Sequence, residues 1–249
     1  MLNTVSALIM FVSGAALAQT PAAPQFEVAS VRPSAPDASN KGSGGSSGSG
    51  RLVMHNSTLK RLMMGAYNVG QNEIIGGPDW LDQDQFDIQA KAEQSAGDEA
   101  LMKMLQSLLA DRFKLAVHRE NRTIPVYVLG IAKNGPKLEK SEPGESSSGN
   151  GNGHLEGRNI SMAGLAWRLG RKLDRPVIDR TGLQGEFNYK LEWTPEEELA
   201  KKAAQPGAAL PDRPSIFVAI QQQLGLKLEP QKAPVEILVI DHAEKPTEN

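Results

Sequence analysis

The two halves of the chain contain matching blocks of sequence, and this internal repeat limits the possible folds more than any other feature. After one Gly/Ser-rich stretch comes RLVMHNSTLKRLMMGAY, and after another comes HLEGRNISMAGLAWRLG, which pairs Asn56 with Asn159. Farther along, FDIQAK corresponds to FNYKLE, and the segment around Pro125 corresponds to the one around Pro234. A long internal repeat predicts two copies of one small fold.

Each copy is expected to contain two helices and several short strands. Apolar residues at helical spacing predict helices that begin after Ser57 or Thr58, near Asp98, after Ser161 and after Ser215. Strand-like runs cover residues 86–90, 113–118, 126–131, 187–193, 226–229 and 235–241. We therefore expect an α+β fold: a tandem duplication of a small βαββαββ unit, with helices packed on one face of a mixed sheet.

The alternation of apolar and polar residues in FNYKLE predicts which side chains are buried. Phe187 and Tyr189 should face the helices and Lys190 should face solvent, because side chains alternate between the two faces of a strand. FDIQAK aligns with FNYKLE, so Phe86 should point inward and Asp87 outward.

Two Gly/Ser-rich tracts, residues 37–50 and 141–153, lack the apolar residues that a core needs. Such tracts are typical of flexible loops. We expect the first repeat unit to span residues 19–140, with the first tract as an internal loop, and the second unit to span residues 154–249.

The N-terminal segment has the pattern of a secretory signal peptide. An apolar run at residues 8–17 is followed by Ala16-Leu17-Ala18, an A-x-A cleavage pattern, so we expect a leader over residues 1–18. The run is shorter than the roughly 20 apolar residues of a transmembrane helix, and we expect none in the mature chain. The chain has no cysteine, which suits a periplasmic or secreted protein stabilised by packing alone.

Composition and motifs exclude several classes of function. The formal net charge of -2 does not indicate a nucleic-acid partner. Without cysteine there is no thiolate metal site and no cysteine nucleophile. Glycine-rich phosphate-binding motifs are missing, so we expect no cofactor. The G-x-S-x-G match at residues 44–48 lies inside a Gly/Ser tract, whereas a nucleophile elbow joins a strand to a helix.

Three histidines lie two residues before a glutamate, and side chains at i and i+2 of a strand share a face. The pairs are His118 with Glu120, His154 with Glu156, and His242 with Glu244. Each pair offers an imidazole and a carboxylate, but the pairs occupy non-equivalent positions and lack the helical H-E-x-x-H spacing. We interpret them as solvated polar strand faces and expect no metal site.

The candidate ligand-binding residues follow two apolar segments. Asp179 and Arg180 lie between a predicted strand and Gly182, and the matching positions in the first unit hold Asp79 and Trp80. The simpler interpretation is a turn closed by an aspartate side chain, with Trp80 covering the sheet edge. The alternative is a ligand-contact loop, because binding residues are concentrated on loops. No residue is assigned a catalytic role.

Several blocks resemble a known family from about residue 26 to residue 249. They include FEVASVRPS, GGPDWL, LQSLLADRFKLAVHRE, VIDRTGLQGEFNYKLEWTP and QLGLKLEPQKAPVEILVID. Together they resemble the soil-associated family of the domain of unknown function 3738. The resemblance implies an exported protein of a type abundant in Acidobacteria, and it carries over no catalytic residue. More distantly, the second unit resembles the short N-terminal domain of secretins and TonB-dependent receptors, a periplasmic interaction module.

These observations favour an exported, non-enzymatic binding or interaction module of the bacterial cell envelope. Its partner would be a protein, a peptide or an envelope glycan. One alternative is a hydrolase of an envelope polymer that uses carboxylates such as Asp179 and Glu186. Another is a structural or assembly module that self-associates through exposed strand edges.

Overall fold

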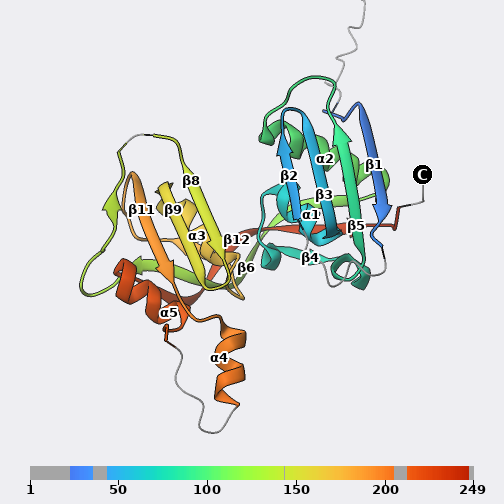
Figure 1. Cartoon of the computed structure of the whole chain (residues 1–249). Coiled ribbons are helices and arrows are strands. Elements are labelled where there is room, and N and C mark those ends of the chain that lie inside the picture. Colours follow the sequence, from blue (N-terminus) through green and yellow to red (C-terminus); the bar gives the residue numbers. More distant parts are fainter. Residues whose placement is uncertain (1–22, 36–43, 143, 205–211, 247–249) are drawn as a thin grey trace, which may run out of the picture.

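The computed structural model describes residues 23–35, 44–142, 144–204 and 212–246, and the leader expected at residues 1–18 lies outside them. Within these residues the chain is α+β, with five α-helices and three four-stranded sheets that are mostly antiparallel. Figure 1 shows two lobes, each with its own antiparallel sheet, connected by the long strands β6 (Ala116–Ile131) and β12 (Leu226–His242).

The first lobe combines an antiparallel sheet with two helices. The sheet has the order β1-β5-β3-β2, with strands β1 (Val28–Pro33), β2 (Gly44–Gly48), β3 (Arg51–Thr58) and β5 (Gln85–Lys91). The helices are α1 (Leu59–Tyr67) and α2 (Asp98–Arg112), which pack on each other. Between α1 and β5 lie the 3₁₀ turn η2 (Gln71–Glu73), strand β4 (Ile74–Gly76) and the turn η3 (Asp79–Asp82).

The sheet of the second lobe has the corresponding strand order. This order is β7-β11-β9-β8, with strands β7 (Glu139–Lys140), β8 (Ser147–Gly151), β9 (His154–Ser161) and β11 (Glu186–Glu192). The helices of this lobe are α3 (Met162–Gly170), α4 (Glu196–Ala203) and α5 (Ile216–Ala219), which continues into the π-helical turn η4 (Ile220–Leu224). Helix α4 was not expected from the sequence, and it has no buried residue.

The third sheet is shared by both lobes and has the order β10-β6-β12-β4. Strands β6 and β12 pair antiparallel over nearly their whole length. Strand β4 adds in parallel beside Leu238, near one end of β12, and β10 (Val177–Asp179) adds in parallel beside Tyr127 of β6. The middle of this sheet is therefore a ribbon of only two strands.

The sequence predicted two separate strands in place of β6 and two in place of β12, and this is wrong. The predicted strands did not include the residues around Pro125, Pro230 and Pro234, yet β6 and β12 run through them without a break. Proline is tolerated on a strand whose outer edge is free, since its missing N–H then costs no ladder hydrogen bond. The two-stranded middle of the ribbon has such edges on both sides.

Two clusters of buried apolar residues form the cores of the lobes, and the long strands contribute to both. The first cluster joins α1, α2 and the β1-β5-β3-β2 sheet to Leu238 and Ile240 of β12. The second joins α3, α5 and the β7-β11-β9-β8 sheet to Leu129 of β6 and Leu226 of β12. Each lobe therefore contains strands from both of the sequence units expected at residues 19–140 and 154–249.

Two helix starts, those of α1 and α3, have the capping chemistry predicted from the sequence. Thr58 caps α1 by accepting a hydrogen bond from the Arg61 N–H, and Ser161 caps α3 by accepting one from Gly164. In both helices the apolar stripe is buried, as predicted. None of the helices in the described part of the chain is long and apolar enough to cross a membrane.

The Gly/Ser tracts contain strands, which differs from the flexible loops expected over residues 37–50 and 141–153. Strand β2 pairs antiparallel with β3, and β8 pairs antiparallel with β9, each at an edge of its sheet. The G-x-S-x-G match is β2 itself, so it does not join a strand to a helix. The side chains of β8 are almost all exposed, so these edge positions need no apolar residue.

The aligned asparagines occupy equivalent positions in the two lobes. Asn56 and Asn159 both have left-handed backbones, with φ of 49° and 59°. The N–H of Asn56 donates to Asp87 Oδ1 at 2.9 Å, and the N–H of Asn159 donates to Asn188 Oδ1 at 3.1 Å. Asp87 was expected simply to face solvent, and instead its carboxylate is part of the local structure.

Candidate ligand-binding cleft

Two cavities lie between the lobes, and residues from both lobes line each of them. The larger has a volume of ≈ 580 Å³ and the smaller ≈ 160 Å³. Trp167 of α3 lines both, so the cavities meet at its ring. Beside them, Asn72 of the first lobe donates a hydrogen bond to the carbonyl of Leu173 in the second at 3.5 Å.

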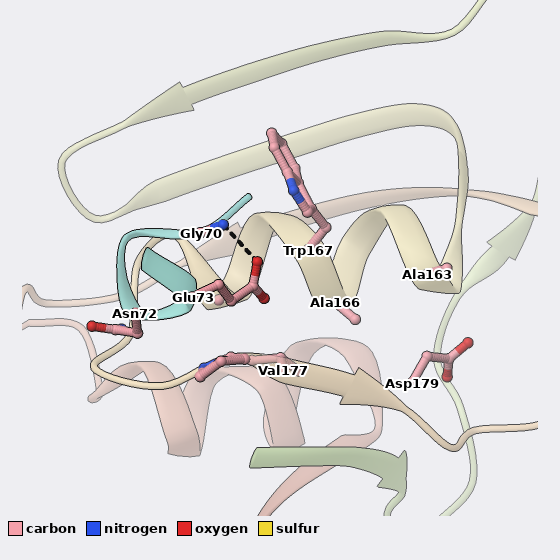
Figure 2. Close-up of a pocket in the computed structure, with 10 residues that line it drawn as sticks. Gly70, Asn72, Glu73, Ala163, Ala166, Trp167, Val177 and Asp179 are labelled. Carbon is pink, nitrogen blue, oxygen red and sulfur yellow. Dashed lines mark hydrogen bonds between the residues drawn. The ribbon is translucent and has the colours of Figure 1, made fainter. Parts of the chain in front are cut away.

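The smaller cavity is a slot walled mainly by small or apolar residues (Figure 2). These are Gly70, Ala163, Ala166, Gly170, Pro176 and Val177. Asn72 and Glu73 lie at one end of it, and Asp179 lies at the other. The carboxylate of Glu73 accepts a hydrogen bond from the N–H of Gly70 at 2.7 Å, which fixes the turn before β4.

The larger cavity is lined by five cationic side chains and one carboxylate. Lys60 and Arg61 come from α1 in the first lobe, and Arg168, Arg171 and Lys172 come from α3 and the residues after it. Because the opposite faces of α1 and α3 are buried in the two cores, these side chains are directed away from the cores. The carboxylate is Asp82, whose Oδ2 lies 3.0 Å from Lys60 Nζ.

The charges of the cleft repel one another across the lobes. Burial lowers the pKa of Arg171, and the positive charge of Arg61 lowers this pKa further. The Arg171 guanidinium lies over the Trp167 ring, 4.9 Å from its centroid. Stacking of this kind holds a guanidinium in place while its N–H groups stay free to donate in the plane.

Arg168 and Lys172 differ in how their polar atoms are satisfied. The Nε atom of Arg168 is buried and has no hydrogen-bond partner within the described residues. Lys172 Nζ donates to the carbonyl of Gly151 at 3.3 Å. A buried donor without a partner is uncommon in proteins and carries a desolvation cost.

Asp179 closes a turn, as the simpler interpretation of the sequence predicted. Its Oδ1 accepts hydrogen bonds from both the N–H and the hydroxyl of Thr181, each at 2.8 Å. Gly182 follows with φ of 70°. Arg180 is exposed, and its N–H donates to the carbonyl of Leu129. A ligand role for Asp179, which lines the small cavity, stays a prediction.

Asp79 and Trp80 lie elsewhere in the molecule. Asp79 is exposed, whereas the Trp80 ring packs on the first core and stacks on Phe113 with centroids 6.4 Å apart. The preceding strand β4 and the strand β10, which ends at Asp179, lie on opposite edges of the shared sheet. The structure therefore does not bring the four predicted residues together into one site.

In each of the three His-x-Glu pairs the histidine lies close to its glutamate; two pairs are within strands β6 and β9, whereas Glu244 lies just beyond the end of β12. The closest nitrogen to oxygen distances are 3.6 Å for His118, 3.8 Å for His154 and 2.8 Å for His242. His118 also lies 2.9 Å from Asp241 on the neighbouring strand. Throughout the described ranges, no three His, Cys, Asp or Glu side chains are arranged to hold a metal ion.

A family model described as a protein of unknown function (DUF3738) matches residues 60–243. The chain belongs to the DUF3738 family. The family match includes the second lobe, part of the first lobe and all five cations of the cleft. No curated protein and no solved structure matches the chain.

Sequence reasoning missed the cationic cleft in this DUF3738 chain. One signal was present, because the run WRLGRK at residues 167–172 contains three of the five cations beside Trp167. The net charge of -2 concealed this local concentration. Arg61 and Arg171 face the same cavity only because of how the two lobes are placed, and no local sequence pattern encodes that placement.

Proposed function

We propose that the chain is an exported, non-enzymatic binding module of the bacterial cell envelope, whose protein, peptide or glycan ligand binds between the lobes. The observation that carries this proposal is the ≈ 580 Å³ cavity lined from both sides. Its volume falls within the range of about 300 to 1,000 Å³ that is typical of ligand sites. Trp167, which lines the cavity, offers a flat apolar surface beside polar groups.

The carboxylates of the two cavities support binding rather than hydrolysis. Glu73, Asp82 and Asp179 each accept a hydrogen bond from a neighbour in the same lobe. Glu186 of the hydrolase alternative lies exposed at the start of β11, and it does not line either cavity. A paired-carboxylate hydrolase needs two carboxyl groups that face one substrate.

The proposal extends to the origin and location of the chain. The A-x-A leader pattern and the lack of cysteine support export to the periplasm or beyond. The left-handed asparagines at equivalent positions, Asn56 and Asn159, support descent of the lobes from a duplicated βαββαββ unit. The proposal also includes an origin in soil bacteria and a relationship of the second unit to secretin-type interaction domains, both of which rest on the sequence resemblances.

Co-sedimentation tests the proposal. The mature chain, from Gln19 onward, is mixed with peptidoglycan sacculi or with envelope membrane vesicles that retain their proteins, and the pelleted fraction is measured. We expect binding to at least one preparation, and a loss of about tenfold or more in affinity for Trp167→Ala. Phe217→Ala is the matched control, because Phe217 is an exposed aromatic residue outside the two cavities.

Two outcomes would contradict the proposal. Absence of binding to both preparations, or equal binding by Trp167→Ala, would reject the cleft as a binding site. Release of soluble fragments from the sacculi, lost in Asp179→Asn or Glu186→Gln, would show that the chain is a hydrolase. Intact sacculi after long incubation are expected.

A further inference from the structure

Three of the five cations of the cleft differ from those cations elsewhere that form ion pairs. Arg119 pairs with Glu236, and Lys245 lies 2.6 Å from Asp84. In contrast, within the described residues no carboxylate pairs with Arg61, Arg168 or Arg171. Lys60 lines the same cavity and does form an ion pair, with Asp82.

Holding unpaired cations together has a cost that a bound anion would remove. Arg61 and Arg171 come from different lobes, and each raises the electrostatic energy of the other. A buried Nε of Arg168 without an acceptor adds a desolvation cost. Core packing does not require these cations, because their helices bury the opposite faces. A site that keeps such costs when empty is suited to a negatively charged ligand.

We propose that the cleft binds a phosphorylated ligand, whose phosphate accepts hydrogen bonds from Arg61 and Arg171 of opposite lobes while its uncharged part lies against Trp167. This inference rests on the proposed function and names the chemistry of its ligand. A carboxylate is satisfied by one bidentate arginine, whereas a phosphate has more oxygens and up to two charges. Three guanidinium groups in one cavity therefore favour phosphate.

The arrangement of Arg171 and Trp167 supports the proposed pose. The Arg171 guanidinium lies over the Trp167 ring, 4.9 Å from its centroid, and both residues line the cavity, so the indole holds this cation beside the space that a phosphate would fill. Trp167 has 37% of its surface exposed, which leaves part of the indole free for a sugar or acyl group. A phosphate held by both lobes would also act as a bridge between them.

Titration with inorganic pyrophosphate tests the proposal, with thermal unfolding and calorimetry as readouts. We expect pyrophosphate to raise the melting temperature of the wild type, and its affinity to fall about tenfold or more in Arg61→Gln or Arg171→Gln. Without ligand, Arg61→Gln should unfold at the same or a higher temperature, because it removes repulsion. Arg51→Gln, an exposed arginine of the same lobe outside both cavities, should behave like the wild type.

The arms of the experiment separate the sources of phosphate. Vesicles containing phosphatidic acid test a lipid headgroup, and free pyrophosphate tests a soluble group; arginine-dependent binding of either supports the proposal. Equal binding of acetate and pyrophosphate, equal binding by Arg61→Gln, or binding of neither phosphate source would overturn it. Sacculus binding that depends on Trp167 but not on Arg61 would leave the proposed function standing and reject the phosphate.

Discussion

Asp87 and Asn188 occupy the same position in the two lobes with different chemistry. Each accepts a hydrogen bond from the N–H of a left-handed asparagine and another from a serine hydroxyl, Ser34 at 2.7 Å or Ser141 at 3.2 Å. Burial raises the pKa of Asp87, but the bonds from Asn56 and Ser34, helped by the neighbouring histidine, outweigh burial and hold it below its ordinary value. The first lobe therefore has an acid-sensitive group where the second has a neutral one.

Asp87 variants should separate hydrogen bonding from charge. Asp87→Ala removes two accepted bonds and is expected to cost about 1 to 2 kcal/mol in urea unfolding at pH 7. Asp87→Asn should keep most of that stability. Because the folded-state pKa is depressed, the stabilisation by the wild-type charge is present above the unfolded pKa and is lost as the pH falls through the folded pKa. Equal acid sensitivity of Asp87→Asn and the wild type would contradict this account.

His118 should respond to pH in the opposite direction. The hydrogen bond to Asp241 raises its pKa against an opposing contribution from burial, and the charge of Asp241 and the neighbouring Glu120 add to the rise. The stabilisation by this pair is thus fully present below the unfolded pKa of about 6.5 and is lost as the pH rises through the folded pKa. In an NMR titration, Asp241→Asn should lower the pKa of His118. Glu236→Gln, which removes the partner of Arg119 on the same strand, should leave it unchanged.

At the scale of elements, what the sequence predicted well was local and periodic. Thr58 and Ser161 cap helices where expected, and the strand alternation places Phe187 and Tyr189 inside and Lys190 outside. What it missed depends on neighbours far along the chain. Residues around Pro125 are strand because β12 pairs beside them, and the Gly/Ser tracts contain strands because β3 and β9 present free edges.

The alternation in β11 predicts a large contrast between adjacent positions. Phe187→Ala removes a ring from the second core, with an expected cost of about 3 to 5 kcal/mol in the free energy of unfolding. Lys190→Ala should change stability by less than about 0.5 kcal/mol, since this side chain is exposed and its ion pair with Glu192 is on the surface. Urea unfolding of both variants measures the contrast, and similar losses would refute the packing of β11.

At the scale of the whole molecule, the sequence predicted a repeat but not how the copies join. The matching blocks place equivalent elements in each lobe, yet β6 and β12 run through both lobes and connect them. The cleft follows from that connection, since it faces α1 of one lobe with α3 of the other. Local patterns contain no information on such a juxtaposition, which is why Asp179 was singled out and Arg61 was not.

The shared strands predict that the protein survives a break in its chain. Proteolysis within residues 141–146, between β7 and β8, would leave β6 in one fragment and β12 in the other. The fragments should stay together, because β6 and β12 pair along their length and Leu238 of the second fragment is buried in the core of the first lobe. Size-exclusion chromatography of the nicked protein should show one peak at the size of the intact chain, and two only in denaturant.

Leu238→Asp places a charge in that core and should release the fragments, whereas Glu236→Gln, exposed on the same strand, should not. Separation of the wild-type fragments in buffer alone would show that each lobe is complete without the strand of the other unit.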